Sequence, residues 1–455
     1  MSAPAPLPGI EAADIQGNVL HGYGNALPHA CYVAVRIPAA VAGRRLLTKL
    51  RPRVTDALHW GDNTPKAALN IAISHRGLDR LGVPGGVLES FPPEFADGMK
   101  QRAAEHLGDG GNGAHTKWEP PLTDIELLVV LHAADPARLA RECERLADDA
   151  ADAGVTVDEP RQEAHRLEGS REHFGFADGL AQPAIAGAPS ANDRGQGVRR
   201  RLRGERPLAL GEFVLGYRDE DGMLPVAPAW PFARNGTFMV FRKLVQDVVA
   251  FRDLLKEIAE RDFGGDQELT AAKIAGRWRD GTPLTVRPSA AVPAPRIPPE
   301  ELNAFGYHDD PRGYTCPIGA HIRRANPRDS LFDGDVRTRR HRIIRRGMPY
   351  GAPLPDGARD EAVRGLMFVC FNASIARQFE VVNGWLRDGA PFGLGVDTDV
   401  LTGDGNGSGK MTFQGDVPVL SRVRGPLVWT RGGEYLFLPS LGALDVLAAG
   451  GFGGA

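Results

Sequence analysis

The chain has 455 residues, 42% of them hydrophobic and 24% charged, an ordinary globular composition with room for two or three domains. Its formal net charge of −3 excludes a strong bulk attraction to nucleic acid or to an anionic membrane. No segment approaches the run of about 18 apolar residues that a membrane span needs. We therefore expect no nucleic-acid partner and no membrane association. The first residues lack the features of an export signal, which predicts a cytoplasmic protein.

The four cysteines predict neither a disulfide framework nor a zinc site. Cys31, Cys143, Cys316 and Cys370 are widely scattered and show none of the paired spacings that those structures require. No CxxCH motif occurs, so covalent attachment of a c-type haem is not indicated.

Hydrophobic periodicity predicts a strand followed by an amphipathic helix four times along the chain. The strands are expected at residues 31–37, 125–132, 236–242 and 366–371, and the helices that follow them end near residues 50, 146, 258 and 386. Shorter strands are expected at residues 69–74, 155–159, 211–217, 427–430 and 435–439. Two βαββαβ units, each an antiparallel sheet covered by helices, would use these elements economically, which predicts an α+β fold.

The two units divide the chain near a linker at residues 187–197. We predict an N-terminal domain over residues 1–190 and a C-terminal domain over residues 198–455. Residues 262–315 are rich in Pro, Gly and charge, with one short helix near residues 270–278. We interpret them as a long excursion of the kind that often covers a site.

A glycine-rich segment at residues 403–412 suggests a phosphate loop. A Walker A motif requires Gly at position 404 and Ser or Thr at position 411, where this chain has Asp404 and Met411. We interpret the segment as a surface turn, and a nucleotide-binding module is the weakest of the functions considered.

The loop Gly175-Phe176-Ala177-Asp178-Gly179 places a single aspartate between glycines. Glycine adopts positive φ readily and lets the backbone approach a ligand, so this loop can hold the Asp178 carboxylate over a cofactor. Phe176, Ala177 and Gly179 would then lie against the same cofactor. The alternative is an ordinary tight turn, because Asp-Gly is a common turn pair.

Residues 316–328, far downstream, offer His321 as a neutral imidazole ligand. A single histidine can equally be a hydrogen-bonded structural residue. The neighbouring Arg323, Arg324 and Arg328 supply cations where carboxylates such as haem propionates need neutralising. An imidazole ligand with a basic surround is expected of a haem b pocket. The two segments together therefore suggest a haem site.

A third segment, residues 343–351, contains Arg345 and Arg346 after an apolar pair. In a strand one of these side chains points inward and the other to solvent, and alternation alone does not choose between them. An inward guanidinium stays charged and can stabilise negative charge that develops on a peroxide oxygen.

Taken in order, these motifs resemble those of the dye-decolourising peroxidases, haem enzymes with two ferredoxin-like domains. The GxxDG motif alone is weak evidence for this family. The same motif followed in order by Ala-His-Ile-Arg and Arg-Arg-Gly-x-Pro-Tyr-Gly is specific for it. The resemblance covers most of the chain and is carried by residues 14–20, 175–179, 212–217, 316–328, 344–351 and 365–371. The resemblance implies one haem b per chain, bound non-covalently. The chain is more similar to the family's larger cytoplasmic classes than to its exported class.

Residue by residue, the resemblance implies that His321 is the proximal iron ligand, Asp178 the distal acid–base residue and Arg345 the distal arginine. Leu366 and Phe368 would bound the peroxide pocket, with Arg323 beside the haem. The proximal histidine of the family donates its second N–H to a carboxylate. The candidates here are Glu380, Asp397 and Asp399, which the sequence leaves unranked.

The expected function is a peroxidase that reduces hydrogen peroxide through an oxoferryl intermediate and oxidises small aromatic donors or dyes. An acidic optimum is expected, because an aspartate stays ionised where a histidine base would be protonated. The alternative from another class is a haem-binding or haem-transfer protein with little turnover. The oligomeric state, including a homo-oligomer, and the physiological electron donor are left open.

Overall fold

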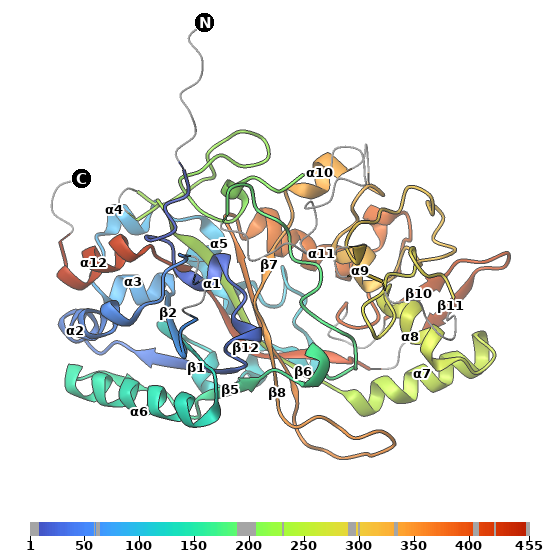
Figure 1. Ribbon diagram of the computed structural model, residues 1–455, viewed down its shortest axis with the longest axis horizontal. Helices are drawn as coiled ribbons and strands as arrows, with labels where there is room; N and C mark the ends of the chain where they lie inside the picture. The colour runs from blue at the N-terminus through green and yellow to red at the C-terminus, as the bar shows by residue number, and fades with distance from the viewer. Residues whose placement is uncertain are drawn as a thin grey trace, which may run out of the picture.

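The computed structural model shows an α+β fold in which antiparallel strand pairs from both halves of the chain form one sheet (Figure 1). It describes residues 9–58, 60, 64–188, 206–229, 232–289, 297–298, 301–331, 335–403, 409–422 and 425–451. Among these residues, no helix combines the length and the hydropathy that a bilayer span requires. Of the linker expected at residues 187–197, residues 189–197 lie outside the described part of the chain, so the domain boundary stays a prediction.

The N-terminal half forms a ferredoxin-like βαββαβ unit. In chain order it consists of β1 (His29–Arg36), α2 (Ala40–Leu50), β2 (Ala67–Ile73), β3 (Leu127–Ala133), α6 (Pro136–Ala153) and β4 (Thr156–Val157). Its strands lie in the order β4-β1-β3-β2. The other elements of this half are α1 (Gly17–Leu20), α3 (His75–Arg80), α4 (Gly85–Leu88), α5 (Pro93–Arg102) and β5 (Gln162–His165), which pairs with β1.

The C-terminal half repeats the same topology. Its elements in chain order are β6 (Thr237–Gln246), α7 (Val248–Asp262), β7 (Ile344–Arg345), β8 (Met348–Tyr350), β9 (Gly365–Asn372), α11 (Val381–Arg387) and β12 (Val428–Leu438). The strand order is β12-β6-β9-β7, with β8 also paired to β9. The fourth strand of each unit thus lies beside the first, as in the N-terminal half. Insertions add α8 (Gln267–Ala275), α9 (His321–Ala325), α10 (Asp335–Arg339), β10 (Lys410–Phe413) and β11 (Val419–Arg422).

The end of the chain joins the two halves. Strand β12 lies beside β2, with Phe437 opposite Ile73 in the register. The last helix, α12 (Leu441–Ala449), then returns to pack against α2 of the N-terminal half (Figure 1). Helix α12 therefore completes the helical layer of the N-terminal half.

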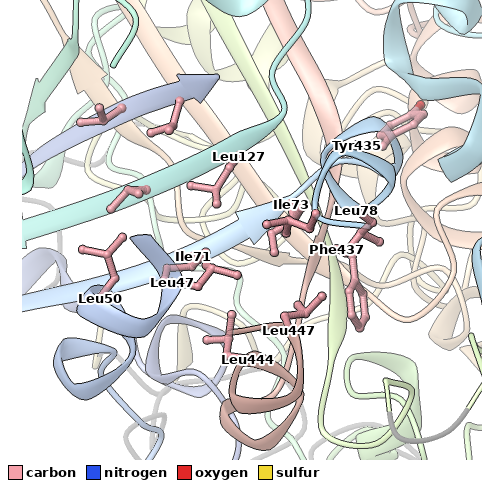
Figure 2. Close-up of a cluster of buried hydrophobic side chains, with 14 of the residues drawn as sticks. Leu47, Leu50, Ile71, Ile73, Leu78, Leu127, Tyr435, Phe437, Leu444 and Leu447 are labelled. Atoms are coloured by element: carbon pink, nitrogen blue, oxygen red, sulfur yellow. The ribbon is translucent and has the colours of Figure 1, made fainter. Parts of the chain in front are cut away.

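Alternate residues of the strands fill two hydrophobic clusters, one on each face of the sheet. On β1, Cys31 and Val33 belong to the helix-covered cluster, whereas Tyr32 belongs to the cluster on the other face. Figure 2 shows the helix-covered cluster where leucines of α2 and α12 meet side chains of β2 and β12. On the other face, Tyr32 of β1 stacks on Phe241 of β6, with their ring centroids 5.3 Å apart. Since these strands are not neighbours in the sheet, the two halves pack face to face there.

Most of the predicted strand-then-helix units are confirmed. The α6 helix begins as its sequence indicates, with Asp135 accepting the N–H of Arg138 and Pro136 in the first turn. The prediction of a strand at residues 211–217 is wrong. The segment forms a short 3-10 helix, Leu210–Glu212, followed by a turn in which Gly216 has φ +89°. The second strand of the C-terminal unit is formed instead by β7 and β8.

Two other differences concern the C-terminal region. The short strands expected at residues 427–430 and 435–439 are one strand, β12, whose register shifts between Thr430 and Gly432. The segment expected as a surface turn at residues 403–412 ends in β10, and its residues 404–408 lie outside the described part of the chain.

Candidate active site

A cavity of about 320 Å³ lies against one face of the C-terminal half of the sheet. Its walls include residues of β6, β7, β9 and β12, of α8, α9 and α11, and of the loops at residues 107–113 and 172–181. This volume falls in the range of small-molecule and cofactor sites, about 300–1,000 Å³. The cavity brings together seven of the residues predicted from sequence, namely Phe176, Ala177, Asp178, His321, Arg345, Leu366 and Phe368.

His321 opens helix α9 and is held by a buried carboxylate. Its Nδ1 lies 2.7 Å from Oδ2 of Asp399, a residue with 1% of its surface exposed. The hydroxyl of Thr402 donates to the same carboxylate oxygen at 2.6 Å. A carboxylate only accepts hydrogen bonds when ionised, so this contact places a proton on Nδ1, and in the neutral ring the lone pair is then on Nε2. Within the described part of the chain, no hydrogen bond occupies Nε2.

The structure distinguishes the three carboxylates that the sequence left unranked. Asp399 contacts His321, whereas Glu380 accepts two hydrogen bonds from Arg102 and one from the Tyr435 hydroxyl. Asp397 accepts the backbone N–H of Thr412 at 2.7 Å. Asp399 is therefore the carboxylate in position to orient the histidine.

Asp178 is presented to the cavity by a loop with two positive-φ glycines. Gly175 has φ +96° and Gly179 has φ +77°. The Asp178 N–H donates to the Ser170 carbonyl at 2.9 Å, and the Ala177 N–H donates to the Arg279 carbonyl at 3.0 Å. A Cβ atom at position 175 would lie 2.5 Å from an Arg279 nitrogen. The glycine-bounded pattern therefore reflects both the backbone conformation and a close approach.

The carboxylate of Asp178 is paired with Arg345. The Arg345 guanidinium donates to Oδ1 at 3.0 Å, and the Gly179 N–H donates to the same oxygen at 2.6 Å. Among the described residues, no donor reaches Oδ2. Burial raises the pKa of Asp178, but the charge of Arg345 and the hydrogen bond from Gly179 outweigh it and hold the pKa below its ordinary value. The group is therefore an ionised proton acceptor with one oxygen available.

Strand geometry decides which arginine enters the cavity. Arg345 faces the cavity, and Ile344 before it belongs to the cluster on the opposite face of the sheet. Arg346 turns the other way and donates to the carbonyl oxygens of Asn18 and Val19. On β9, Leu366 and Phe368 line the cavity while the residues between and after them are buried in the sheet.

Glu172 is a cavity residue to which the sequence assigned no role. Its carboxylate accepts the backbone N–H groups of Phe174 and Phe176, both at 2.9 Å, and the side-chain amide of Gln246 at 2.6 Å. Burial raises the pKa of Glu172 above its ordinary value, because it outweighs these three hydrogen bonds. The side chain links the Asp178 loop to β6. A glutamate before a glycine-bounded loop is too common to reveal this role from sequence.

Arg323 does not line the cavity, contrary to the expectation that it lies beside a cofactor. It is 1% exposed and donates to the Cys316 and Asp310 carbonyl oxygens at 2.7 and 2.9 Å. Two residues along an α-helix correspond to a rotation of about 200°, so Arg323 points away from the face that carries His321. Gly179 is exposed at the edge of the loop and does not line the cavity either.

Besides Arg345, three cations of the cavity come from residues that the sequence did not single out for it. Arg242, Arg277 and Arg342 line the cavity together with Arg345. Arg242 is paired with Asp109. Arg277 and Arg342 hydrogen-bond main-chain carbonyl oxygens, and their charge can offset that of acidic groups on a bound molecule.

These residues fit a haem. In the described part of the chain, no cluster of three or more His, Cys, Asp or Glu side chains could hold a metal ion on its own. A lone imidazole is sufficient for an iron whose in-plane ligands come from a macrocycle. The cavity supplies one such imidazole oriented by a carboxylate, an apolar wall and several guanidinium groups. An ionised carboxylate and a guanidinium complete a site for acid–base chemistry on a small polar substrate.

Comparison with known proteins identifies relatives that are peroxidases. Residues 223–391 match the model of the C-terminal region of Dyp-type peroxidases. The chain is 30% identical to Peroxidase 2 of Mycetinis scorodonius over 96% of its own length and 87% of that protein. It is 33% identical to the multifunctional dye peroxidase DyP2 of an Amycolatopsis species over 83% of its length and 82% of that protein. A solved dye-decolorizing peroxidase in complex with 2,6-dimethoxyphenol superimposes with a TM-score of 0.81 at 26% identity, covering 96% of this chain and 100% of that one.

Proposed function

The chain belongs to the dye-decolourising peroxidase family and is a peroxide-dependent oxidoreductase, and from that premise we propose how its own residues perform the reaction. The proposed cofactor is one haem b per chain, bound non-covalently, with His321 as its protein ligand. The observation that carries the proposal is a single cavity that contains the Asp399-backed His321 and the Asp178–Arg345 pair.

Asp178 moves the proton in this proposal. Hydrogen peroxide must lose a proton from one oxygen and gain one on the other before its O–O bond breaks with water as the leaving group. The available Oδ2 of Asp178 accepts the proton from the first oxygen and returns it to the second. The lowered pKa of Asp178 keeps the carboxylate ionised when peroxide arrives.

Arg345 and the apolar wall complete the distal side of the cavity. The guanidinium of Arg345 can stabilise the negative charge that grows on the departing oxygen. Leu366 and Phe368 exclude water from the proton-transfer site. When bound, haem b supplies the redox-active iron that passes electrons from an organic donor to peroxide.

The proposed donors are small aromatic compounds and dyes. The structural relative bound to 2,6-dimethoxyphenol supports this class of donor. We also propose a cytoplasmic location, which the four free thiols support because thiols persist in a reducing compartment.

The decisive experiment is the reaction of the Asp178→Asn variant with hydrogen peroxide in a stopped-flow instrument. The amide preserves shape but cannot accept the proton, so the rate of the first spectral change should fall by about 10²-fold or more. Haem content and the resting spectrum should stay unchanged. Asp309→Asn, at an exposed carboxylate, is the control and should react as the unmodified protein does. An unchanged rate in Asp178→Asn would reject the role of Asp178. The absence of a rapid spectral change in the unmodified protein with one equivalent of H2O2 would instead favour a haem-binding protein with little turnover.

A further inference from the structure

The carboxylate that orients His321 belongs to a short turn whose own groups also bind it. Oδ2 of Asp399 accepts three hydrogen bonds, from His321 Nδ1 at 2.7 Å, from the Thr402 hydroxyl at 2.6 Å and from the Thr402 N–H at 3.2 Å. The Leu401 N–H donates to Oδ1 at 3.2 Å. His321 therefore shares a single carboxylate oxygen with the hydroxyl of Thr402.

The turn is fixed by its main chain as well as by these contacts. The Asp399 N–H donates to the Leu386 carbonyl at 2.7 Å, and the Gly403 N–H donates to the Asp399 carbonyl at 2.8 Å. A Cβ atom at position 403 would lie 2.5 Å from the Asp399 carbonyl oxygen, so the close approach there requires glycine. The position of Asp399 thus depends on several contacts that do not involve the Thr402 hydroxyl.

The Thr402 hydroxyl and the His321 imidazole compete for the charge of one oxygen. At 2.6 Å, the contact from the hydroxyl has the length of a strong, charge-assisted hydrogen bond. The Asp399 side chain is 0% exposed, so water does not screen this competition. A carboxylate that accepts the Nδ1–H makes the imidazole a more basic ligand, and a hydroxyl on the same oxygen reduces that effect.

We propose that the Thr402 hydroxyl limits the basicity of His321 and thereby raises the reduction potential of the haem iron. A more basic imidazole favours ferric over ferrous iron, and hydrogen bonding around the axial ligand is one of the influences that set a haem potential. Thr402 acts through Asp399, so it is a positioning residue and not a catalytic one. This role depends on the proposed ligation of haem iron by His321.

The sign of a shift in potential separates this role from a merely structural one. If the hydroxyl only held Asp399 in place, its loss would weaken the contact with His321, and the midpoint potential would rise. If the hydroxyl competes for the carboxylate charge, its loss strengthens that contact, and the midpoint potential falls. Asp399→Asn removes the charge itself and marks the direction of the first case.

The test is a spectroelectrochemical titration of the haem-loaded, full-length protein. Thr402→Val replaces the hydroxyl by a methyl group and should lower the ferric/ferrous midpoint potential. At a fixed potential the ferric-to-ferrous ratio should rise by about threefold or more. Asp399→Asn should raise the midpoint potential. Thr402→Ser keeps a hydroxyl and should stay near the unmodified protein.

Thr412→Val is the matched control. The Thr412 hydroxyl donates to Asp397 at 3.1 Å, so this variant also removes a hydroxyl from a carboxylate. Asp397 is not hydrogen-bonded to His321, whose Nδ1 contacts Asp399. The midpoint potential of Thr412→Val should therefore equal that of the unmodified protein.

Resonance Raman spectroscopy of the ferrous protein gives a second readout. The iron–histidine stretching band should move to higher frequency in Thr402→Val, because a more basic imidazole binds iron more strongly. An unchanged or raised midpoint in Thr402→Val, with this band present, would overturn the role of Thr402 and leave ligation by His321 intact. A shift in Thr402→Ser as large as in Thr402→Val would overturn it too. A haem-loaded, unmodified protein without the band would overturn ligation by His321 and the role of Thr402 together.

Discussion

At the scale of single residues, the candidate active site consists of two charge pairings with different consequences. Asp399 fixes the proton of His321 on Nδ1, which gives the ring one ligand face and one orientation. Arg345 keeps Asp178 ionised while one of its oxygens faces no donor among the described residues. The first pairing suits an imidazole for metal ligation, and the second prepares a carboxylate for proton transfer.

The pairing of Asp178 with Arg345 predicts how activity depends on pH. The reaction requires the ionised carboxylate, so activity is lost as pH falls through the pKa of Asp178. Because that pKa lies below its ordinary value, the unmodified enzyme should stay active in acid. In Arg345→Leu the influence of burial prevails and the pKa rises, so the acidic limb should move up by about one pH unit or more. The measurement is kcat/KM against pH with a dye that does not titrate in this range.

Arg345→Lys is the matched control for this shift, because it keeps a positive charge near the carboxylate. Its maximal rate should fall, since a lysine lacks the fork geometry of the guanidinium. Its acidic limb should stay nearer to that of the unmodified enzyme than the limb of Arg345→Leu does. Identical limbs in all three proteins would show that Asp178 does not set the acidic limit.

At the scale of secondary-structure elements, the site depends on how a loop, a short helix and two strands present their side chains. Alternation along β9 directs Leu366 and Phe368 to the cavity, and the short α9 helix directs His321 there but not Arg323. The Asp178 loop has no regular structure of its own and is held by Glu172, whose carboxylate bonds two loop N–H groups and Gln246 of β6.

Glu172→Gln should therefore loosen the Asp178 loop. The single side-chain oxygen of glutamine cannot accept all three hydrogen bonds that Glu172 accepts. The amide nitrogen that replaces the other oxygen is itself a donor and would face an N–H group without accepting from it. Leaving buried donors unsatisfied costs about 1–3 kcal/mol, so hydrogen exchange of the Phe174 and Phe176 amides should accelerate by about tenfold or more. Glu168→Gln is the control, because that glutamate is exposed in the same segment. Unchanged exchange in Glu172→Gln would contradict a role of this carboxylate in holding the loop.

At the scale of the whole molecule, the two ferredoxin-like units are joined by the last strand and helix of the chain. Strand β12 belongs to the C-terminal unit and pairs with β2 of the N-terminal unit at Phe437 and Ile73. Helix α12 then buries Leu444 and Leu447 against the helical layer of the N-terminal unit (Figure 2). The stability of both units should therefore respond to a change in α12.

Leu447→Ala should lower the free energy of unfolding by about 2–5 kcal/mol, because it removes a fully buried leucine and leaves a cavity in the shared core. Denaturant titration followed by far-UV circular dichroism measures this loss. Val41→Ala on the adjoining α2 is the control, since Val41 is 68% exposed and its truncation should cost about 0.5 kcal/mol or less. Equal losses in the two variants would show that α12 does not stabilise the joint.

Most of the fold could be predicted from local patterns. Period-2 and period-3.6 hydrophobicity identified the strands and helices of both units, because each has one side or stripe facing a core. The prediction failed at residues 211–217, where an apolar run with two glycines turns rather than extends. The helices between β2 and β3 were missed because they are short and interrupted by glycine and proline, which weakens the periodic signal.

By itself, the sequence determined the strand-then-helix repeat, the glycines that shape the Asp178 loop, and the residue types that can ligate iron and move a proton. These depend on backbone conformation and side-chain chemistry, which are local properties. Only the tertiary structure decided that Asp399 rather than Glu380 or Asp397 backs His321, and that Arg323 faces away from the cavity. Such pairings join residues far apart in the chain, so they follow from packing of the two units and not from spacing along the sequence.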